Sequence, residues 1–367
     1  MKKLLSSFEI CVFAYFIMRG FFVGITINNL ILTTKQDGYI SIIVGFIIGL
    51  IPLLLYLYLI NYNHQYNFID ILNAEFGKKV GKIITIFLGL FCLLFSTISF
   101  WNLTNLINSQ YLANTPTFFI GLIFLIPMIY ILSQNINIIG RSSCIFFYFS
   151  IILWIIPFLG LIFQIKLINI LPLLENGIKP ILGGTYQYIT NNIFSLFLLT
   201  IFPKNIIRDK NNVNKRLILS YCLINLILFL TFFTTLSIFG VKLATIYQYP
   251  EFHLLKRVSI GGFVQRIESA LSIQWIFDMF VTNVLSLYYF NNIVLKIFNA
   301  HTKKFQTIAL LISTISVLII SNYIFSNNTI SSIFLRTIFP TCITIFFFII
   351  PLITYFKITI KKTKHVS

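Results

Sequence analysis

Long apolar runs recur along nearly the whole chain, and they constrain its fold more than any other feature. A helix needs roughly 17 to 25 apolar residues to cross a bilayer. The sequence predicts ten such crossings, two of them short, at residues 8–32, 40–60, 83–106, 118–132, 144–165, 189–202, 217–239, 270–293, 308–325 and 333–356. Composition agrees, because 58% of residues are hydrophobic and only 10% are charged, far from soluble domains. We therefore predict an all-α polytopic membrane protein with a single integral membrane domain over residues 1–367.

Lysine and arginine are distributed unevenly among the gaps between these runs. If the N-terminus is cytoplasmic, 18 of the 27 lie in cytoplasmic gaps, 8 lie outside, and Arg19 falls within the first span. Positive charge collects on the cytoplasmic side of membrane proteins, so both termini are predicted to be cytoplasmic. The same explanation covers the +18 net charge, and nucleic-acid binding is not expected. The first span, which holds Glu9 and Arg19 and lacks a cleavage site, is expected to remain in the mature protein.

The ten spans divide into two sets of five around the loop at residues 166–188. Five is odd, so the second set enters the membrane from the opposite side, which predicts two inverted repeats at about 8–165 and 189–356. Transporters of this architecture bind their ligands where the first helix of each repeat is interrupted. The first span has Gly20 and Gly24 at mid-length, and the sixth is the shortest. We predict interruptions in helices 1 and 6.

Several short patterns recur in a set order: DGYIS at 37–41, FGKKVG at 76–81, LPLLENGIKP at 171–180, QRIES at 265–269 and WI at 275–276. Together they resemble the GerAB family of spore germination proteins, the B subunits of nutrient germinant receptors. The resemblance implies an amino acid-polyamine-organocation type fold and a small nutrient ligand. It also implies A-type and C-type partner subunits and a location in the spore inner membrane.

The chain departs from the family pattern at both interruptions. The first helix of the family usually carries paired glycines followed by a proline, whereas residues 18–26 contain no proline. The sixth often has a glycine and an acidic residue, where this chain has Ser195 and Phe197. The identity of the ligand therefore does not carry over from the family.

An interrupted helix offers free N–H groups at one end and free C=O groups at the other. A carboxylate favours the first and an ammonium the second, which suits an amino acid. The predicted ligand-binding residues are Gly20, Phe21, Gly24, Asn191, Asn192 and Ser195. The alternative is that the glycines permit close helix packing and the polar side chains bond neighbouring helices.

Two ionisable residues lie within predicted spans, Arg19 in the first and Asp278 in the eighth. Each is costly in a membrane unless it has a partner, so we predict an intramembrane ion pair or a shared aqueous cavity. The alternative places each nearer an interface, with Arg19 reaching toward the headgroups. Residues 249–268 mix charged and apolar residues outside the membrane. There Arg266 and Glu268 are predicted to belong to a gate or docking surface, or to an ordinary interfacial helix.

No catalytic motif occurs in the chain, and no enzyme activity is expected. The five cysteines stand singly in apolar segments, so neither a metal site nor a cofactor is predicted. The expected partners are the A-type and C-type subunits, a small-molecule nutrient and membrane lipid. Two functions remain open: a receptor subunit that senses a nutrient, and a secondary transporter of amino acids or cations.

Overall fold

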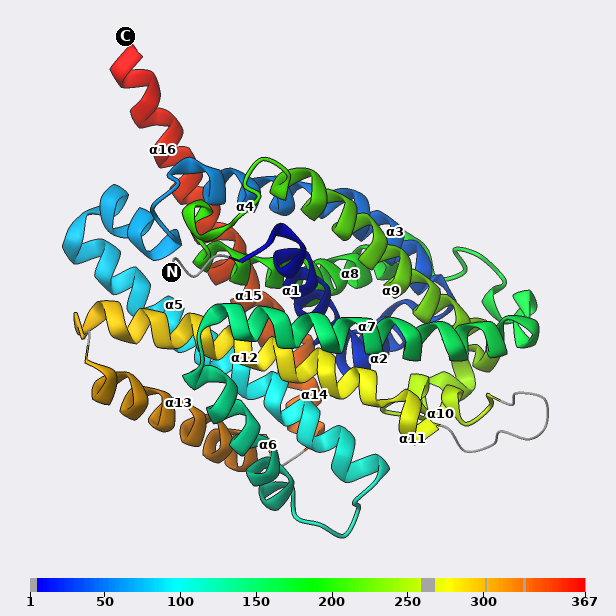
Figure 1. Cartoon of the computed structure of the whole chain (residues 1–367). Coiled ribbons are helices and arrows are strands. Elements are labelled where there is room, and N and C mark those ends of the chain that lie inside the picture. Colours follow the sequence, from blue (N-terminus) through cyan, green and yellow to red (C-terminus); the bar gives the residue numbers. More distant parts are fainter. Residues whose placement is uncertain (1–4, 259–267, 301, 326–327, 367) are drawn as a thin grey trace.

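The computed structural model describes residues 5–258, 268–300, 302–325 and 328–366, and they are almost entirely helical (Figure 1). These residues form one isolated β-bridge, between Leu5 and Ile207, and no strand. The predicted all-α architecture is confirmed. The helices are α1 (Ser7–Arg19), α2 (Ile27–Thr34), α3 (Gly38–Ile48), α4 (Leu50–Tyr62), α5 (Phe68–Gln110), α6 (Thr117–Ser133), α7 (Ile136–Leu161), α8 (Ile178–Tyr188), α9 (Val213–Ala244), α10 (Pro250–Leu255), α11 (Glu268–Leu271), α12 (Ile273–Ile297), α13 (Lys303–Ile324), α14 (Asn328–Arg336), α15 (Ile338–Ile343) and α16 (Ile350–Val366).

Seven helical runs of the described residues are long and apolar enough to cross a membrane. The first, Ser7–Tyr62, has 56 residues, or roughly 84 Å of helix, enough to cross a core of about 30 Å twice. It turns at Lys35, whose φ of 51° ends α2. The predicted fourth span corresponds to α6, which is apolar but has only 17 residues. The protein is thus a polytopic membrane protein, while the ten crossings and the two repeats stay predictions.

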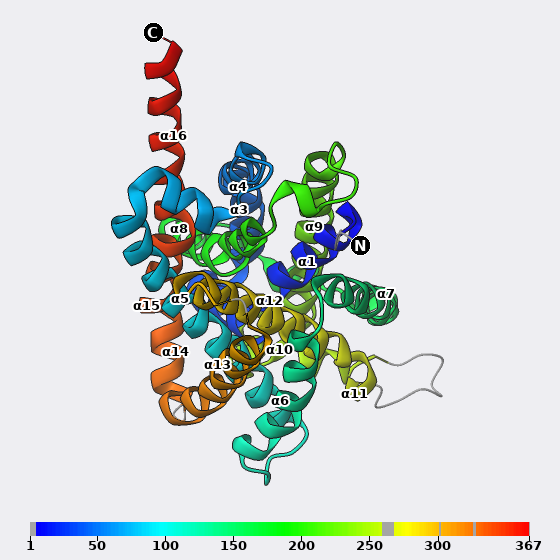
Figure 2. The ribbon, with the colours of Figure 1, turned by 60° about the vertical axis from the view of Figure 1, so that its left-hand side comes forward.

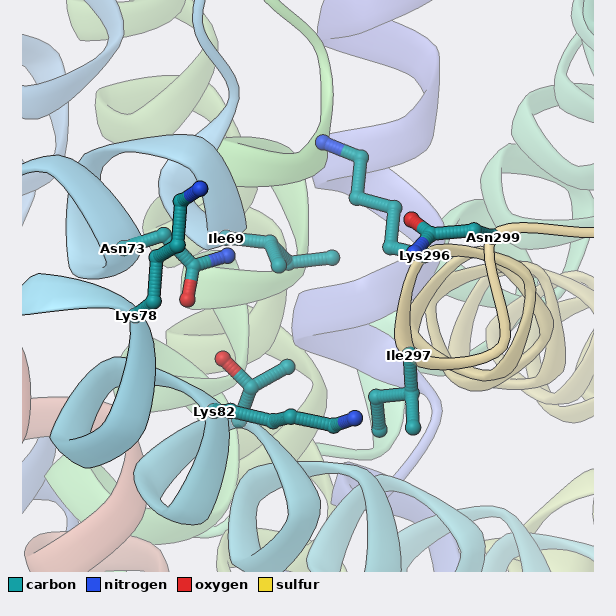
Figure 3. Close-up of a pocket in the computed structure, with 8 residues that line it drawn as sticks. Ile69, Asn73, Lys78, Lys82, Lys296, Ile297 and Asn299 are labelled. Carbon is teal, nitrogen blue, oxygen red and sulfur yellow. The ribbon is translucent and has the colours of Figure 1, made fainter.

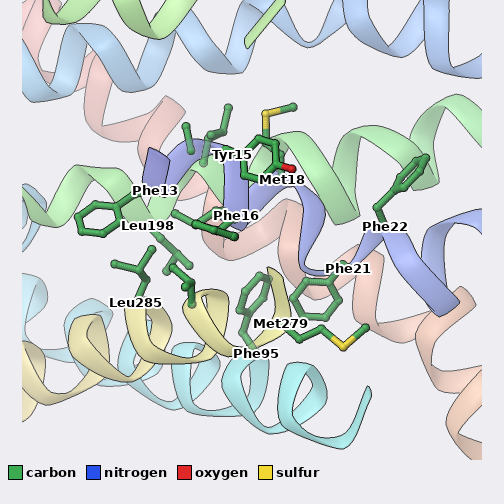
Figure 4. Close-up of a cluster of buried hydrophobic side chains, with 14 of the residues drawn as sticks. Phe13, Tyr15, Phe16, Met18, Phe21, Phe22, Phe95, Leu198, Met279 and Leu285 are labelled. Carbon is green, nitrogen blue, oxygen red and sulfur yellow. The ribbon is translucent and has the colours of Figure 1, made fainter. Parts of the chain in front are cut away.

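The α1 helix lies at the centre of the bundle, enclosed by α7, α9 and α12 (Figure 2). Every residue of α1 except Phe8 is buried, as expected for a helix that is apolar all round. Aromatic and aliphatic side chains fill the space about it. Figure 4 shows Phe16 and Phe21 among Met279 of α12 and Phe95 of α5.

The outer faces of the bundle are apolar. Ile123 and Ile126 of α6 and Phe149 and Leu159 of α7 are each more than half exposed. A continuous exposed apolar surface of this kind is unfavourable in water, and acyl chains cover it in a bilayer. The α16 helix and the beginning of α5 lie to the left in Figure 1, whereas α10 and α11 lie to the right. The bundle therefore has two distinct ends.

Topology is testable with short epitope tags inserted after Asn114, between α5 and α6, and after Asn211, before α9. Both residues are exposed, so the insertions should be tolerated. If the positive-inside distribution sets the orientation, antibody labelling of intact protoplasts should detect the first tag and miss the second until the cells are opened. Detection of both tags on the same side would contradict the ten-crossing topology.

Candidate functional site

The first helix is interrupted between Arg19 and Ile27, as predicted. The intervening turn has non-helical backbone at Val23, with ψ of 130°, and at Gly24, with φ of 74°. The φ of Gly24 lies in the left-handed region that favours glycine. A Cβ at this position would lie 2.2 Å from the ring of Tyr249. Both backbone conformation and space therefore require glycine here.

Backbone groups freed by this interruption have partners within the chain. The Gly24 N–H donates to Oε1 of Glu251 over 2.7 Å, and the Val23 carbonyl accepts from Nδ2 of Asn102 over 3.0 Å. The Gly20 N–H completes the last turn of α1. From the sequence, we expect these N–H groups to be free for a ligand carboxylate. Instead, the Glu251 carboxylate of the protein accepts the hydrogen bond from the Gly24 N–H.

The sixth segment is also irregular. After α8 it continues as a π-helical turn and then a 3₁₀ helix, Ile189–Ile193 and Phe194–Ile201. Asn192 donates through Nδ2 to the Met18 carbonyl over 2.6 Å. Ser195 Oγ donates to the Asn192 carbonyl over 2.5 Å and lies 3.3 Å from the Ile17 carbonyl. The predicted site residue Asn192 therefore bonds the carbonyl end of α1, and Ser195 lies beside it.

Asn191 differs from its neighbour Asn192 in having no partner. It is fully buried, and neither Oδ1 nor Nδ2 makes a hydrogen bond to any described residue. Oδ1 of Asn192 is also unpartnered. The turn that carries both residues contacts the interrupted turn of the first helix. A buried polar group left without a partner costs about 1–3 kcal/mol, so these amides mark a place where a polar molecule would be stabilised.

The other two predicted ligand residues pack within the core. A Cβ on Gly20 would lie 2.2 Å from Oγ1 of Thr282. The ring of Phe21 lies 4.5 Å from that of Phe95 and 5.5 Å from that of Phe339, measured between centroids. At these two positions the structure places neighbouring side chains of α12, α5 and α15.

Arg19 and Asp278 face each other across the interface between α1 and α12. Nε of Arg19 lies 2.8 Å from Oδ2 of Asp278, and the two side chains are only 4% and 1% exposed. Nη2 of Arg19 donates to Oε1 of Gln274 over 3.2 Å, and the guanidinium lies over the Tyr15 ring. Removing either charge would leave the other buried without compensation.

A cavity of about 260 Å³ opens beside the interruption and includes Gly24 in its lining. Asn28, Asn29, Trp101 and Arg336 also line it. Arg336 donates to Oδ1 of Asn29 over 3.0 Å and to Oδ1 of Asn28 over 3.3 Å. No carboxylate in the described part of the chain lies within 4 Å of this guanidinium. The cavity thus presents an uncompensated positive charge.

Glu251 is the residue that sequence reasoning missed. It lies in α10, outside the spanning helices, and is 2% exposed, with Oε2 unpartnered among the described residues. Burial raises the pKa of its carboxyl to about 7. The sequence offers one weak signal for this role, since Glu251 is one of only 9 acidic residues and directly follows Pro250.

Of the two residues predicted to belong to a gate or docking surface, Arg266 lies outside the described residues. Glu268 begins α11, which contacts α7, α10 and α12.

Comparison with known families identifies the family to which this chain belongs. The family model described as spore germination protein matches residues 5–331. The chain belongs to the spore germination protein family. It is 27% identical over 257 residues, 70% of each chain, to putative spore germination protein YfkT of Bacillus subtilis (strain 168). From the same organism, spore germination protein A2 is 26% identical over 282 residues, 74% of this chain and 75% of that protein. Spore germination protein KB is 24% identical over 180 residues, 48% of each chain.

The ion pair of this spore germination protein is testable with a double-mutant cycle. Arg19→Ala strands a buried carboxylate and should lower stability by about 3–5 kcal/mol, measured as thermal unfolding in detergent. Arg19→Ala combined with Asp278→Asn should recover part of that loss. A matched control is Arg216→Ala, because the Arg216–Asp209 pair is 47% and 31% exposed and exposed pairs contribute about 0–1 kcal/mol. Additive losses for Arg19 and Asp278 would contradict their coupling.

The raised pKa of the Glu251 carboxyl should make the stability of the folded protein depend on pH. Its pKa of about 7 in the folded protein exceeds the ordinary 4.5, so the stabilisation is complete below pH 4.5 and is lost as pH rises through 7. The loss is on the order of 3 kcal/mol. Glu251→Gln keeps an oxygen for the Gly24 N–H and removes the titration. Its unfolding temperature should therefore fall less than that of the wild type between pH 5 and 8, and equal slopes would rule out this role for Glu251.

Proposed function

We propose that this spore germination protein is the B subunit of a nutrient germinant receptor. It binds a small nutrient, an amino acid, between the interrupted first and sixth helices, and it signals germination together with A-type and C-type subunits. Its location is the spore inner membrane, with both termini on the core side. The family match over residues 5–331 and the relatives named as spore germination proteins support this assignment.

The observation that carries the proposal is the unpartnered amide of Asn191. Buried polar groups in proteins nearly always have hydrogen-bond partners, and a primary amide offers two donors and an acceptor with two lone pairs. An amino acid has complementary groups, since its carboxylate accepts and its ammonium donates. Nδ2 of Asn191 would meet the carboxylate, and Oδ1 of Asn191 and of Asn192 would meet the ammonium.

We infer that the nutrient enters through the cavity beside Gly24, because the interrupted turn that lines this cavity contacts the turn that carries Asn191. On the predicted topology it opens away from the cytoplasm, and its volume of about 260 Å³ is below the roughly 300–1,000 Å³ of sites for drug-sized ligands. A molecule of amino-acid size suits that volume. Arg336, which lacks a carboxylate partner among the described residues, would attract the carboxylate of an entering nutrient.

The substitution Asn191→Leu tests the proposal in a strain where this receptor is the sole one. Because Asn191 has no partner among the described residues, its replacement should preserve or raise thermal stability. The nutrient concentration for half-maximal germination should nevertheless rise by about tenfold or more, as expected for the loss of one to two hydrogen bonds, each of about 0.5–1.5 kcal/mol.

Asn225→Leu is the matched control, because the Asn225 amide bonds the hydroxyl of Tyr188 and the carbonyl of Tyr221. That variant should lose stability, whereas Asn191→Leu should not. An unshifted nutrient dose response in Asn191→Leu spores would place the ligand elsewhere. Substituting Gly24 is less informative, since any side chain there meets Tyr249 whether or not a ligand binds.

A further inference from the structure

A second, larger cavity lies at the opposite end of the bundle from α10. Its volume is about 490 Å³, and it opens between the beginning of α5 and the end of α12. Figure 3 shows Lys78 and Lys82 on one side, Lys296 and Asn299 on the other, and the Lys82 amine extending toward Ile297. Three lysines thus face one space on the side predicted to be cytoplasmic.

The three lysines differ in their partners. Nζ of Lys296 lies 2.7 Å from Oδ1 of Asn67 and 2.5 Å from Oδ1 of Asp70, so its charge is compensated. Neither Lys78 nor Lys82 has a carboxylate within 4 Å in the described ranges of the chain. The cavity therefore holds two uncommitted positive charges.

A break in α5 lies beside this cavity. Gly77, with φ of 80° and ψ of 162°, separates the first part of α5 from the long remainder of the helix. The first part is tied to α16, where Lys357 lies over the Phe76 ring and Lys361 lies 3.5 Å from Glu75. The cavity lies at this break, where the membrane-crossing part of α5 begins, and a membrane surface is expected at such a break.

Exposed apolar side chains adjoin the cavity. Ile86 lies one turn beyond Lys82 on the same side of α5 and is 39% exposed. Phe298 follows the cavity residue Ile297 and is 67% exposed. Positive charge adjoining exposed hydrocarbon matches the amphipathic character of a phospholipid, whose phosphate lies directly above its acyl chains.

We propose that this cavity binds the phosphate of an anionic phospholipid headgroup through Lys78 and Lys82, with the acyl chains against the adjoining apolar surface. Basic pockets between membrane helices on the cytoplasmic side are suited to such headgroups. The site is separate from the nutrient site, so it stands whether or not the nutrient proposal holds. Asn73 and Asn299 line the same space and supply neutral hydrogen-bond donors. Thr85 also lines it, with its hydroxyl donating to the Gly81 carbonyl.

Native mass spectrometry of the full chain in detergent, titrated with phosphatidylglycerol or phosphatidylcholine, tests the site. Each basic residue near a membrane surface contributes about 1 kcal/mol to anionic-lipid binding, so Lys78→Gln with Lys82→Gln should weaken phosphatidylglycerol binding roughly 30-fold. Lys79→Gln with Lys304→Gln removes the same charge from exposed positions that do not line the cavity. This control should bind like the wild type, and phosphatidylcholine should bind weakly to all.

Four outcomes would overturn the proposal. Equal weakening in both double variants would show a general charge effect, not binding in this cavity. Displacement of phosphatidylglycerol by inorganic phosphate at equal concentration would assign the cavity to free phosphate. Displacement by an acidic peptide at the same concentration would assign it to a protein partner. Lys78→Arg with Lys82→Arg preserves both charges and should retain the lipid, and its failure to do so in a folded protein would exclude the ionic mechanism.

Discussion

A helix that breaks inside a bilayer frees backbone N–H and C=O groups that water cannot reach, and each must find a partner within the protein. The interrupted first helix imposes this requirement at the centre of the bundle. Glu251 accepts from the Gly24 N–H, and Asn102 donates to the Val23 carbonyl. Asn192 donates to the carbonyl of Met18. The partners come from α10, α5 and the sixth segment, so one break fixes the relative positions of three distant parts of the chain.

The buried charges lie beside this break, and they too need partners within the protein. Arg19 ends α1, and its contact with Asp278 connects the broken helix to α12. A charge in hydrocarbon is tolerated when it faces the bundle interior and has an opposite partner. The apolar core of the protein thus encloses a small set of paired polar groups beside the break. Asn191 differs from them, since neither polar atom of its amide has a partner in the described structure.

The two ends of the bundle present different chemistry. The cavity beside Gly24 contains Arg336 and two asparagines, which suits a small carboxylate. The cavity between α5 and α12 contains three lysines next to exposed apolar side chains, which suits a lipid headgroup. The proposed nutrient site and the proposed lipid site therefore lie at opposite ends of the bundle, and substitutions can alter one without contacting the other.

Sequence alone determined the fold class and the position of the first interruption, because hydropathy and the placement of glycine are local properties of the chain. It also brought Arg19 and Asp278 together as a hypothesis, since charges in apolar spans are rare. Only the tertiary structure decided which groups complete the break. Glu251 lies 227 residues from Gly24, and nothing local distinguishes it from a solvated acid. Asn191 and Asn192 are adjacent and chemically identical, yet Asn192 bonds Met18 and Asn191 has no partner among the residues that the structure describes. That difference arises because successive residues of a helical turn point in different directions, and the packing of α1 against the sixth segment determines which of them meets a carbonyl.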